Sequence, residues 1–314
     1  MLYGIIDIGS NSVRLNVYIY KNQKIDLIFS KKEKLGLLMY VEKGKISKKG
    51  IEKIVTLIKN LNKAMNHLKI KKFSYFATAS LRNIDNSAKA IETIEKETKI
   101  NVTLLTGKEE GELGFVGSKK ELKKKKGIFI DIGGGSTEIV FFDKKEIQSI
   151  YSIPIGSLKL YKKCVSKIIP TKKERELMKK EILNELEKAK IQKKEKHWNH
   201  GKNRNDTPIY GIGGSLRALN ELMLELGLEK KKNILKISSL KDLEKGLKSN
   251  SDKIIEKILL IKPSRIHTLI PGILIIDVLS SYFNCSKVQI CNSGVREGYL
   301  EKFLSEEYYE KIEL

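Results

Sequence analysis

Two stretches of this chain, 3–18 and 127–142, repeat one order of residue types. Each begins with an apolar run, passes through an aspartate and a turn of small residues, and ends in a second apolar run. Asp7 and Asp131 occupy equivalent places. Apolar runs bounded by glycine-rich turns are typical of paired strands. Because both copies continue through a polar turn into a third apolar run, the chain is predicted to contain a duplicated domain.

Each predicted turn has the composition of an anion-binding loop. Turns of glycine and serine present backbone N–H groups to anions, and a nearby aspartate can hold a Mg²⁺ ion that bridges phosphate oxygens. One such loop alone is a weak signal, because ordinary β-turns have the same composition. Two copies in register favour a phosphoryl ligand with a metal ion.

Length and composition bound the class of protein. A chain of 314 residues has room for two domains with well-buried cores. Its three cysteines are odd in number and lack disulfide or metal-ligand spacing, which indicates a reducing compartment. The longest apolar stretch, 269–279, is too short to span a bilayer and contains Asp277. We therefore expect a cytoplasmic protein with no membrane partner.

The formal net charge of +23 would suit a polyanionic partner. Most of the basic residues are lysines, and the chain is also rich in isoleucine and asparagine, as an AT-rich genome would produce. No helix-turn-helix, zinc-finger or RNA-binding aromatic pattern is present, so we expect no nucleic-acid partner. Whether the lysine content serves function or reflects genome bias stays open at this stage.

Arginine is scarce, with seven residues in the chain. Where lysine supplies most of the positive charge, arginine marks candidate sites that need a planar fork for phosphate or carboxylate. Arg14, Arg82, Arg217 and Arg296 all lie beside small-residue motifs. For each of them, pairing with a glutamate or capping a helix is the alternative.

The remaining pattern places further elements along the chain. Apolar spacing predicts helices over 49–70, 87–99, 171–192, 271–283 and from 297 onward, and strands over 73–78, 102–105, 209–212 and 287–291. A helix should also begin after Thr106, its predicted N-cap, with Glu109 and Glu110 in the first turn. His197 and His200 lie in a polar loop and, without a third ligand, favour exposed loop chemistry over a metal pair.

The motifs together resemble one known family. Six of them occur in the order seen in the exopolyphosphatase and guanosine pentaphosphate phosphatase (Ppx/GppA) family: Asp7-Ile-Gly-Ser-Asn-Ser12, Ala77-Thr-Ala-Ser-Leu-Arg82, Gly107-Lys-Glu-Glu110, Asp131-Ile-Gly-Gly-Gly-Ser-Thr-Glu138, Gly211-Ile-Gly-Gly-Ser215 and Gly294-Val-Arg-Glu-Gly298. The resemblance covers essentially the whole chain. It implies an α/β fold of two duplicated actin-like (ribonuclease H-like) domains with an interdomain cleft. The expected domains are 1–120 and 121–299, with a terminal helix over about 300–314 packing back on the first.

The resemblance also implies roles for particular residues. Glu110 matches the catalytic glutamate that activates the attacking water, although stabilisation of a helix start is its alternative, a task that Glu109 already fulfils. Asp7, Asp131 and Glu138 are implied to be catalytic and to place Mg²⁺ or Mn²⁺. The implied phosphate-binding residues are Ser10, Asn11, Ser12, Arg82, Gly133, Gly134, Gly135, Ser136, Gly213, Gly214 and Ser215.

The implied activity is that of an exopolyphosphatase, which hydrolyses the terminal phosphoanhydride of polyphosphate and releases orthophosphate. The alternative is removal of the 5′ γ-phosphate of pppGpp to give ppGpp, so the partner is polyphosphate or guanosine penta- or tetraphosphate. An ATP-dependent small-molecule kinase and a non-catalytic sensor of these ligands are further alternatives. As a short two-domain form without the helical C-terminal region of long members, the chain is expected to prefer shorter chains or a nucleotide, and a homodimer is one assembly it permits. Glu112 stands where many relatives carry arginine.

Overall fold

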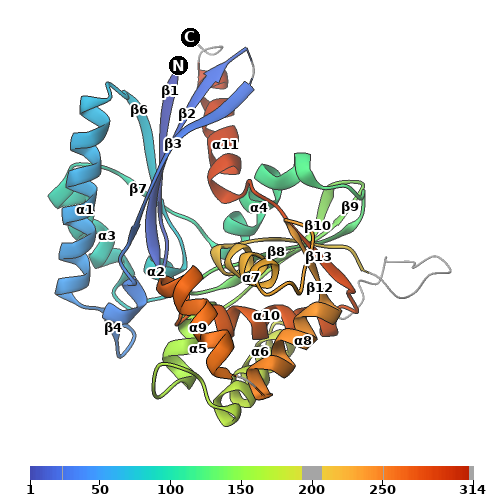
Figure 1. The fold of residues 1–314 in the computed structure, drawn as a ribbon. Helices are drawn as coiled ribbons and strands as arrows, with labels where there is room; N and C mark the ends of the chain where they lie inside the picture. Colours follow the sequence, from blue (N-terminus) through green and yellow to red (C-terminus); the bar gives the residue numbers. More distant parts are fainter. Residues whose placement is uncertain (23, 193–206, 250, 311–314) are drawn as a thin grey trace. The chain divides into compact units, whose positions relative to one another are not determined.

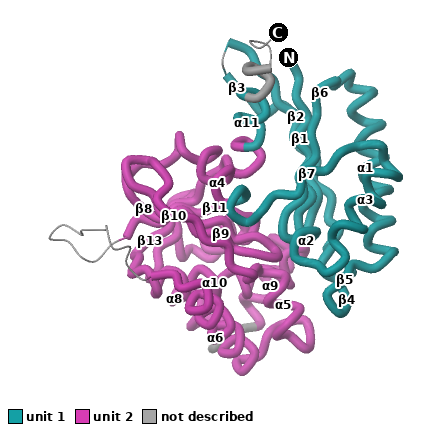
Figure 2. Tube along the Cα trace, turned by 180° about the vertical axis from the view of Figure 1, so that it is seen from behind, with its two compact units in different colours: residues 1–110, 299–314 teal, residues 111–298 magenta. Residues whose placement is uncertain are grey.

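The computed structural model describes the chain except for residues 23, 193–206, 250 and 311–314 (Figure 1). His197 and His200 lie outside the described residues. The chain divides into two compact units, Met1–Glu110 with Tyr299–Leu314, and Gly111–Gly298 (Figure 2). None of the helices in the described part is both long enough and apolar enough to cross a lipid bilayer.

Unit 1 is built on a five-stranded sheet in the order β3-β2-β1-β6-β7. Its strands are β1 (Leu2–Ile8), β2 (Ser12–Lys21), β3 (Lys24–Lys34), β6 (Lys72–Ala77) and β7 (Val102–Leu104). The first three strands form an antiparallel meander, and β6 and β7 continue the sheet parallel to β1. A small hairpin of β4 (Val41–Glu42) and β5 (Lys45–Ile46) follows a 3-10 turn, η1 (Leu37–Tyr40).

Helices cover both faces of this sheet. The helices of unit 1 are α1 (Lys48–His67), α2 (Ala79–Arg82), α3 (Ser87–Thr98) and the part of α11 (Val295–Glu310) that begins at Tyr299. Ser47 caps α1 by accepting a hydrogen bond from the Gly50 amide. The apolar stripes of α1 and α3 pack with Tyr75 in one core cluster. Tyr299 contacts the other face, where its ring lies 4.7 Å from that of Phe76.

Unit 2 repeats the same plan in a six-stranded sheet. Its order is β10-β9-β8-β11-β13-β12, so the first five strands follow the order of unit 1. The six strands are β8 (Gly127–Ile132), β9 (Thr137–Asp143), β10 (Glu146–Ile153), β11 (Ile209–Ile212), β12 (Ile234–Lys236) and β13 (Lys287–Ile290). Again a three-stranded antiparallel meander is extended by parallel strands, here β11 and β13, and β12 is added antiparallel to β13 at the edge. The two units are duplicated α/β domains with a shared strand order, which confirms the predicted fold class.

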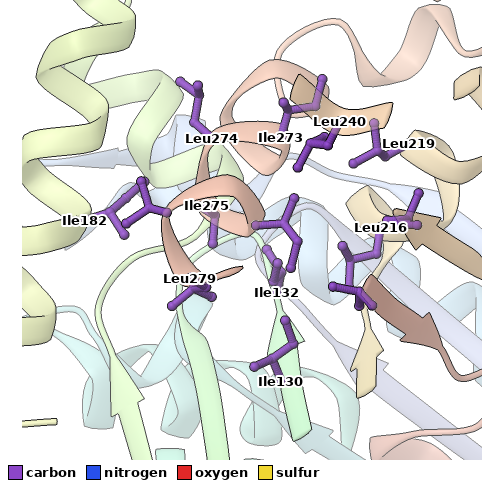
Figure 3. Close-up of a cluster of buried hydrophobic side chains, with 14 of the residues drawn as sticks. Ile130, Ile132, Ile182, Leu216, Leu219, Leu240, Ile273, Leu274, Ile275 and Leu279 are labelled. Carbon is purple, nitrogen blue, oxygen red and sulfur yellow. The ribbon is translucent and has the colours of Figure 1, made fainter. Parts of the chain in front are cut away.

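The core of unit 2 surrounds an apolar helix, α10 (Leu269–Tyr282), which is buried from Leu269 to Ser280. Ile275 and Leu279 of α10 lie toward Ile130 and Ile132 of β8 (Figure 3). The surrounding elements are α5 (Ser157–Cys164), α6 (Lys172–Lys188), α7 (Gly214–Glu225), α8 (Ile237–Ser249), α9 (Ser251–Ile261) and the 3-10 turn η3 (Pro263–Arg265). A helix that is apolar on all sides requires such complete cover.

One helix, α4 (Gly107–Ser118), runs from unit 1 into unit 2, and the turn η2 (Lys119–Glu121) follows it. The boundary between the two units lies between Glu110 and Gly111, within the first turn of this helix. The sequence placed the boundary after residue 120, where a lysine run resembles a linker. That run comes only after a complete helix that belongs to unit 2.

Candidate active site

The first small-residue loop connects β1 to β2 in unit 1. The Gly9 amide donates to the Ser12 carbonyl at 3.1 Å and closes the turn. The carbonyls of Ser10 and Asn11 accept hydrogen bonds from the backbone of 35–38. In a trans peptide the C=O and N–H point in opposite directions, so the amides of Asn11 and Ser12 point away from that segment. This is the arrangement that a phosphate-binding loop requires.

The second loop connects β8 to β9 in unit 2 and repeats this geometry. The Gly133 amide donates to the Ser136 carbonyl at 3.0 Å. The start of α5 docks on the carbonyl side, where amides of 157–159 donate to Gly133 and Gly134 at 2.9–3.0 Å. The amides of Gly134 and Gly135 therefore point to the opposite side. The duplication thus extends from the sequence to individual hydrogen bonds.

Asp131 and Glu138 form a carboxylate pair at the base of the second loop. They lie directly opposite each other in the β8–β9 register, with at least one carboxylate oxygen of each within 4.8 Å of the other. Both side chains are buried, and the Ser152 hydroxyl donates to Glu138 at 2.8 Å. Two buried carboxylates this close repel each other unless a cation lies near. Their oxygens are the donors that Mg²⁺ and Mn²⁺ prefer, so the pair fits such an ion.

The equivalent pair in unit 1 has a different charge. Asp7 lies opposite Arg14 in the β1–β2 register. An aspartate facing a guanidinium is already balanced in charge and is a poorer place for a metal ion than two carboxylates. The two aspartates are therefore equivalent in position and different in chemistry.

Glu110 lies in the first turn of α4, and its neighbour carries the capping role. The Glu109 carboxylate accepts from the Thr106 amide at 2.8 Å while the Thr106 hydroxyl accepts from the Glu109 amide at 3.2 Å. The bond from the Thr106 amide lowers the pKa of Glu109. Glu110 instead accepts from the Arg82 guanidinium at 2.9 Å, and Arg82 also donates to the Leu105 carbonyl at 2.8 Å.

The residue after Glu110 is a glycine because its neighbours leave little room for a side chain. A Cβ on Gly111 would lie 2.9 Å from the Ile150 side chain and 3.4 Å from the Cβ of Glu138. The backbone of α4 therefore presses closely against β9 and β10 within unit 2. One peptide bond separates Glu110 from a residue that packs on Glu138.

The predicted third loop is the start of a helix. Gly213 occupies the N-cap position of α7 with a φ of 121°, and Gly214 and Ser215 belong to its first turn. A Cβ on Gly213 would lie 2.4 Å from the Ile132 carbonyl oxygen, so a glycine is required by both space and conformation. Ser215 donates to the Ser157 hydroxyl, which in turn donates to the Gly133 carbonyl, each at 3.2 Å. Unit 2 therefore brings the second and third loops together.

Gly156 packs directly on the second loop and provides a test of its importance. A Cβ there would lie 2.4 Å from both the Gly134 carbonyl carbon and the Gly135 nitrogen. We expect Gly156→Ala to displace the loop and to lower kcat/KM for the substrate that the loop binds by about tenfold or more, because a shift of an ångström suffices for such losses. The control is Gly246→Ala, whose Cβ would meet only the flexible end of Ile254 at 2.8 Å. Equal kinetics of the two variants would contradict this role.

Three arginines gather around the start of α7. The Arg265 guanidinium lies over Gly214, where a Cβ would be 2.1 Å from its Nη2 atom. Burial, followed by the charge of Arg217, lowers the pKa of Arg265. Burial and the charge of Arg296 lower the pKa of Arg217, whereas the charge of Asp131 raises it. Mutually repelling guanidiniums at a helix N-terminus favour an anionic ligand.

The structure groups the residues predicted from the sequence within each unit. Unit 1 holds Asp7, the first loop and the Arg82–Glu110 pair, and the Ser80 hydroxyl of α2 donates to the Ile8 carbonyl at 3.2 Å beside that loop. Unit 2 holds Asp131, Glu138 and both remaining loops. The sequence reasoning did not single out Arg265 as a site residue, although the scarcity of arginine was a signal that applied to it.

Comparisons with known proteins identify the family. The model of the Ppx/GppA phosphatase family matches residues 16–307. Exopolyphosphatase 1 of Mycobacterium tuberculosis is 29% identical over 164 residues, which are 51% of this chain and 48% of that protein. The guanosine-5′-triphosphate,3′-diphosphate pyrophosphatase of Aliivibrio fischeri is 21% identical over an alignment of 327 positions, gaps included, which covers 99% of this chain and 61% of that protein. The matches therefore span about half to three fifths of these relatives.

Solved structures share the fold over nearly the whole chain. An exopolyphosphatase from Cytophaga hutchinsonii has a TM-score of 0.82 at 22% identity, and the Aquifex aeolicus member of the Ppx/GppA family has 0.74 at 24%. In both comparisons 98% of this chain and 98% of the other chain are covered. The family match, the duplicated loops and the fold lead to one conclusion: the chain belongs to the Ppx/GppA phosphatase family.

Proposed function

We propose that this protein is an exopolyphosphatase that hydrolyses the terminal phosphoanhydride of inorganic polyphosphate and releases orthophosphate with the help of Mg²⁺ or Mn²⁺. The observation that carries the proposal is the buried Asp131–Glu138 pair at the base of a glycine loop whose carbonyls are held by α5. A metal site next to the outward amides of Gly134 and Gly135 suits the end of a phosphate chain.

In this proposal Asp131 and Glu138 hold the divalent ion. When bound, the ion would neutralise charge on the phosphate oxygens at the reacting end. Asp7 lies opposite Arg14 in the β1–β2 register, so we assign it no direct bond to the ion. The amides of Asn11, Ser12, Gly134 and Gly135 and the first turn of α7 bind the phosphates; Ser10, Gly133, Ser136 and Gly213 shape these loops.

Glu110 is the proposed general base, which orients the attacking water and accepts its proton. Its hydrogen bond from Arg82 fixes the direction of the carboxylate. Arg82 is then first a positioning residue. A guanidinium has five N–H donors, so it keeps donors for a phosphate oxygen as well.

A second candidate reaction is removal of the 5′ γ-phosphate of pppGpp. The Aliivibrio fischeri relative, which aligns over 99% of this chain, supports it. The same terminal phosphoanhydride is cleaved in both reactions, so the residues assigned above would serve either substrate. A non-catalytic sensor needs no general base, and a kinase would use its base to accept a proton from an acceptor hydroxyl, so the reaction products distinguish both alternatives from hydrolysis.

The experiment compares kcat/KM for tripolyphosphate, long polyphosphate and pppGpp with Mg²⁺. The proposal expects polyphosphate to be the better substrate. A strong preference for pppGpp would replace it by the second candidate. ADP together with a phosphorylated acceptor would indicate a kinase, and binding without turnover by metal-loaded protein would indicate a sensor.

A further inference from the structure

Eight lysines gather at one end of the unit 2 sheet. We call this group the basic platform: Lys119, Lys120, Lys123, Lys124, Lys125, Lys126, Lys144 and Lys145. The first two belong to η2, the next four lead into β8, and the last two form the turn between β9 and β10. Most of them are exposed. The active-site proposal makes no use of these residues.

Backbone hydrogen bonds hold the platform together. The Lys145 amide donates to the Lys125 carbonyl at 2.8 Å, which joins the β9–β10 turn to the lysine run. The Lys124 amide donates to the Tyr210 hydroxyl at 2.8 Å, which ties the run to β11. The lysines are therefore not a free tail, and their charges are concentrated on an ordered surface.

The same segments carry few carboxylates, and two of them accept backbone hydrogen bonds. Only Glu121, Asp143 and Glu146 accompany the eight lysines, a larger excess of positive charge than the 61 basic and 38 acidic residues of the whole chain. Glu121 accepts from the Asn292 and Ser293 amides at 2.8–3.1 Å. Asp143 accepts from the Lys144 amide at 2.8 Å. The platform is thus strongly positive.

The distance between the platform and the second loop sets the minimum length of a ligand that contacts both. β8 begins at the platform and ends at the second loop, and its six residues span about 20 Å at the rise of a strand. Tripolyphosphate bound at the loop is far shorter than this distance. Only an extended polyanion can occupy both places.

The chemistry of the platform favours inorganic polyphosphate over nucleic acid. All eight residues are lysines, which act toward phosphates as flexible point charges and offer no planar fork for bidentate contacts. None of them is aromatic, whereas single-stranded nucleic acids are usually held by stacking on aromatic rings. We propose that the basic platform binds the distal part of a long polyphosphate chain whose end lies at the second loop. This inference rests on the proposed function.

The test is a triple variant, Lys123→Gln with Lys124→Gln and Lys125→Gln. Its matched control is Lys172→Gln with Lys173→Gln and Lys180→Gln, which removes the same charge from exposed positions on α6. For the platform variant we expect KM for long polyphosphate to rise about tenfold or more, with a shallower dependence on salt, because fewer counterions are released. Its kcat and its KM for tripolyphosphate should stay within about twofold of wild type, as expected for exposed residues outside the site.

Equal KM values for long polyphosphate in wild type and the platform variant would overturn the inference, as would an equal rise in both triple variants. Equilibrium binding of long polyphosphate and of single-stranded RNA separates the remaining outcomes. Loss of RNA binding with polyphosphate binding intact would show a nucleic-acid surface instead. If wild type hydrolyses neither tripolyphosphate nor long polyphosphate, the proposed function fails. In that case, binding of long polyphosphate that is lost in the platform variant would still support this inference. The absence of such binding would refute it.

Discussion

Glu110→Gln is expected to lower kcat for polyphosphate by about 10²- to 10⁴-fold, the range for loss of a general base. Glutamine keeps the size of the side chain and can still accept the hydrogen bond from Arg82, so substrate binding should change little. The measurement is steady-state phosphate release together with equilibrium binding of substrate. Wild-type kcat in this variant would remove Glu110 from the mechanism.

The matched control is the adjacent residue. Glu109 lies in the same turn of α4, yet it serves the capping box with Thr106. Glu109→Gln should leave kcat nearly unchanged and lower the free energy of unfolding by about 1 kcal/mol or less, as for the weakening of a cap. A loss of kcat of similar size in both variants would show that the start of the helix matters more than the base.

Asp131→Asn is expected to lower kcat/KM by about 10³-fold or more at fixed Mg²⁺, because it removes one of two carboxylates assigned to the ion that stabilises charge on the reacting phosphate. Titration of activity with Mg²⁺ should show a shift of the activation midpoint to higher concentration. Direct binding of Mn²⁺, followed by its electron paramagnetic resonance signal, should weaken in parallel. This readout does not depend on turnover.

Asp143→Asn, at the other end of the same hairpin, is the control for this change. Its carboxylate accepts only from the neighbouring Lys144 amide among the bonds described above. Mn²⁺ binding should match that of wild type, and so should activity on tripolyphosphate. Unaltered Mn²⁺ binding in Asp131→Asn would refute the assignment of Asp131 as a ligand.

The sequence predicted the two sheets because their determinants are local. In each copy an apolar run, an aspartate and a turn of small residues follow each other within 16 positions. The sequence also indicates which residues lie opposite Asp7 and Asp131. Arg14 follows Asp7, and Glu138 follows Asp131, by the same seven positions, and the length of a hairpin loop fixes which residues face each other. The difference between the two aspartates could therefore have been predicted.

Other parts of the site depend on contacts between distant residues. Arg265 lies over Gly214, and Gly156 packs on Gly134, although many residues separate each pair along the chain. The hydrogen bond from Arg82 to Glu110 joins α2 to α4. No local sequence pattern indicates such contacts between distant residues. The sequence predicted that Arg82 binds a phosphate, which stays a prediction beside its observed bond to Glu110.

The sequence did not predict that α4 runs from unit 1 into unit 2. Its first turn is acidic and its end is followed by lysines, so the pattern indicated a helix followed by a linker. A boundary between units inside one helix leaves no trace in composition, because the residues on both sides have helical spacing. Gly111 and Gly117 were the available signals, since each stands where a Cβ would collide with a neighbour in unit 2.

The central claim is that water attacks the terminal phosphate of a polyphosphate chain. Time-resolved ³¹P NMR tests it most directly, because it separates the signals of terminal phosphate, internal phosphate and orthophosphate during incubation with protein and Mg²⁺. The account predicts that orthophosphate grows from the start at the expense of internal phosphate, while the number of chain ends stays constant until chains become short. An early rise in chain ends, which would indicate internal cleavage, or the absence of orthophosphate would contradict it.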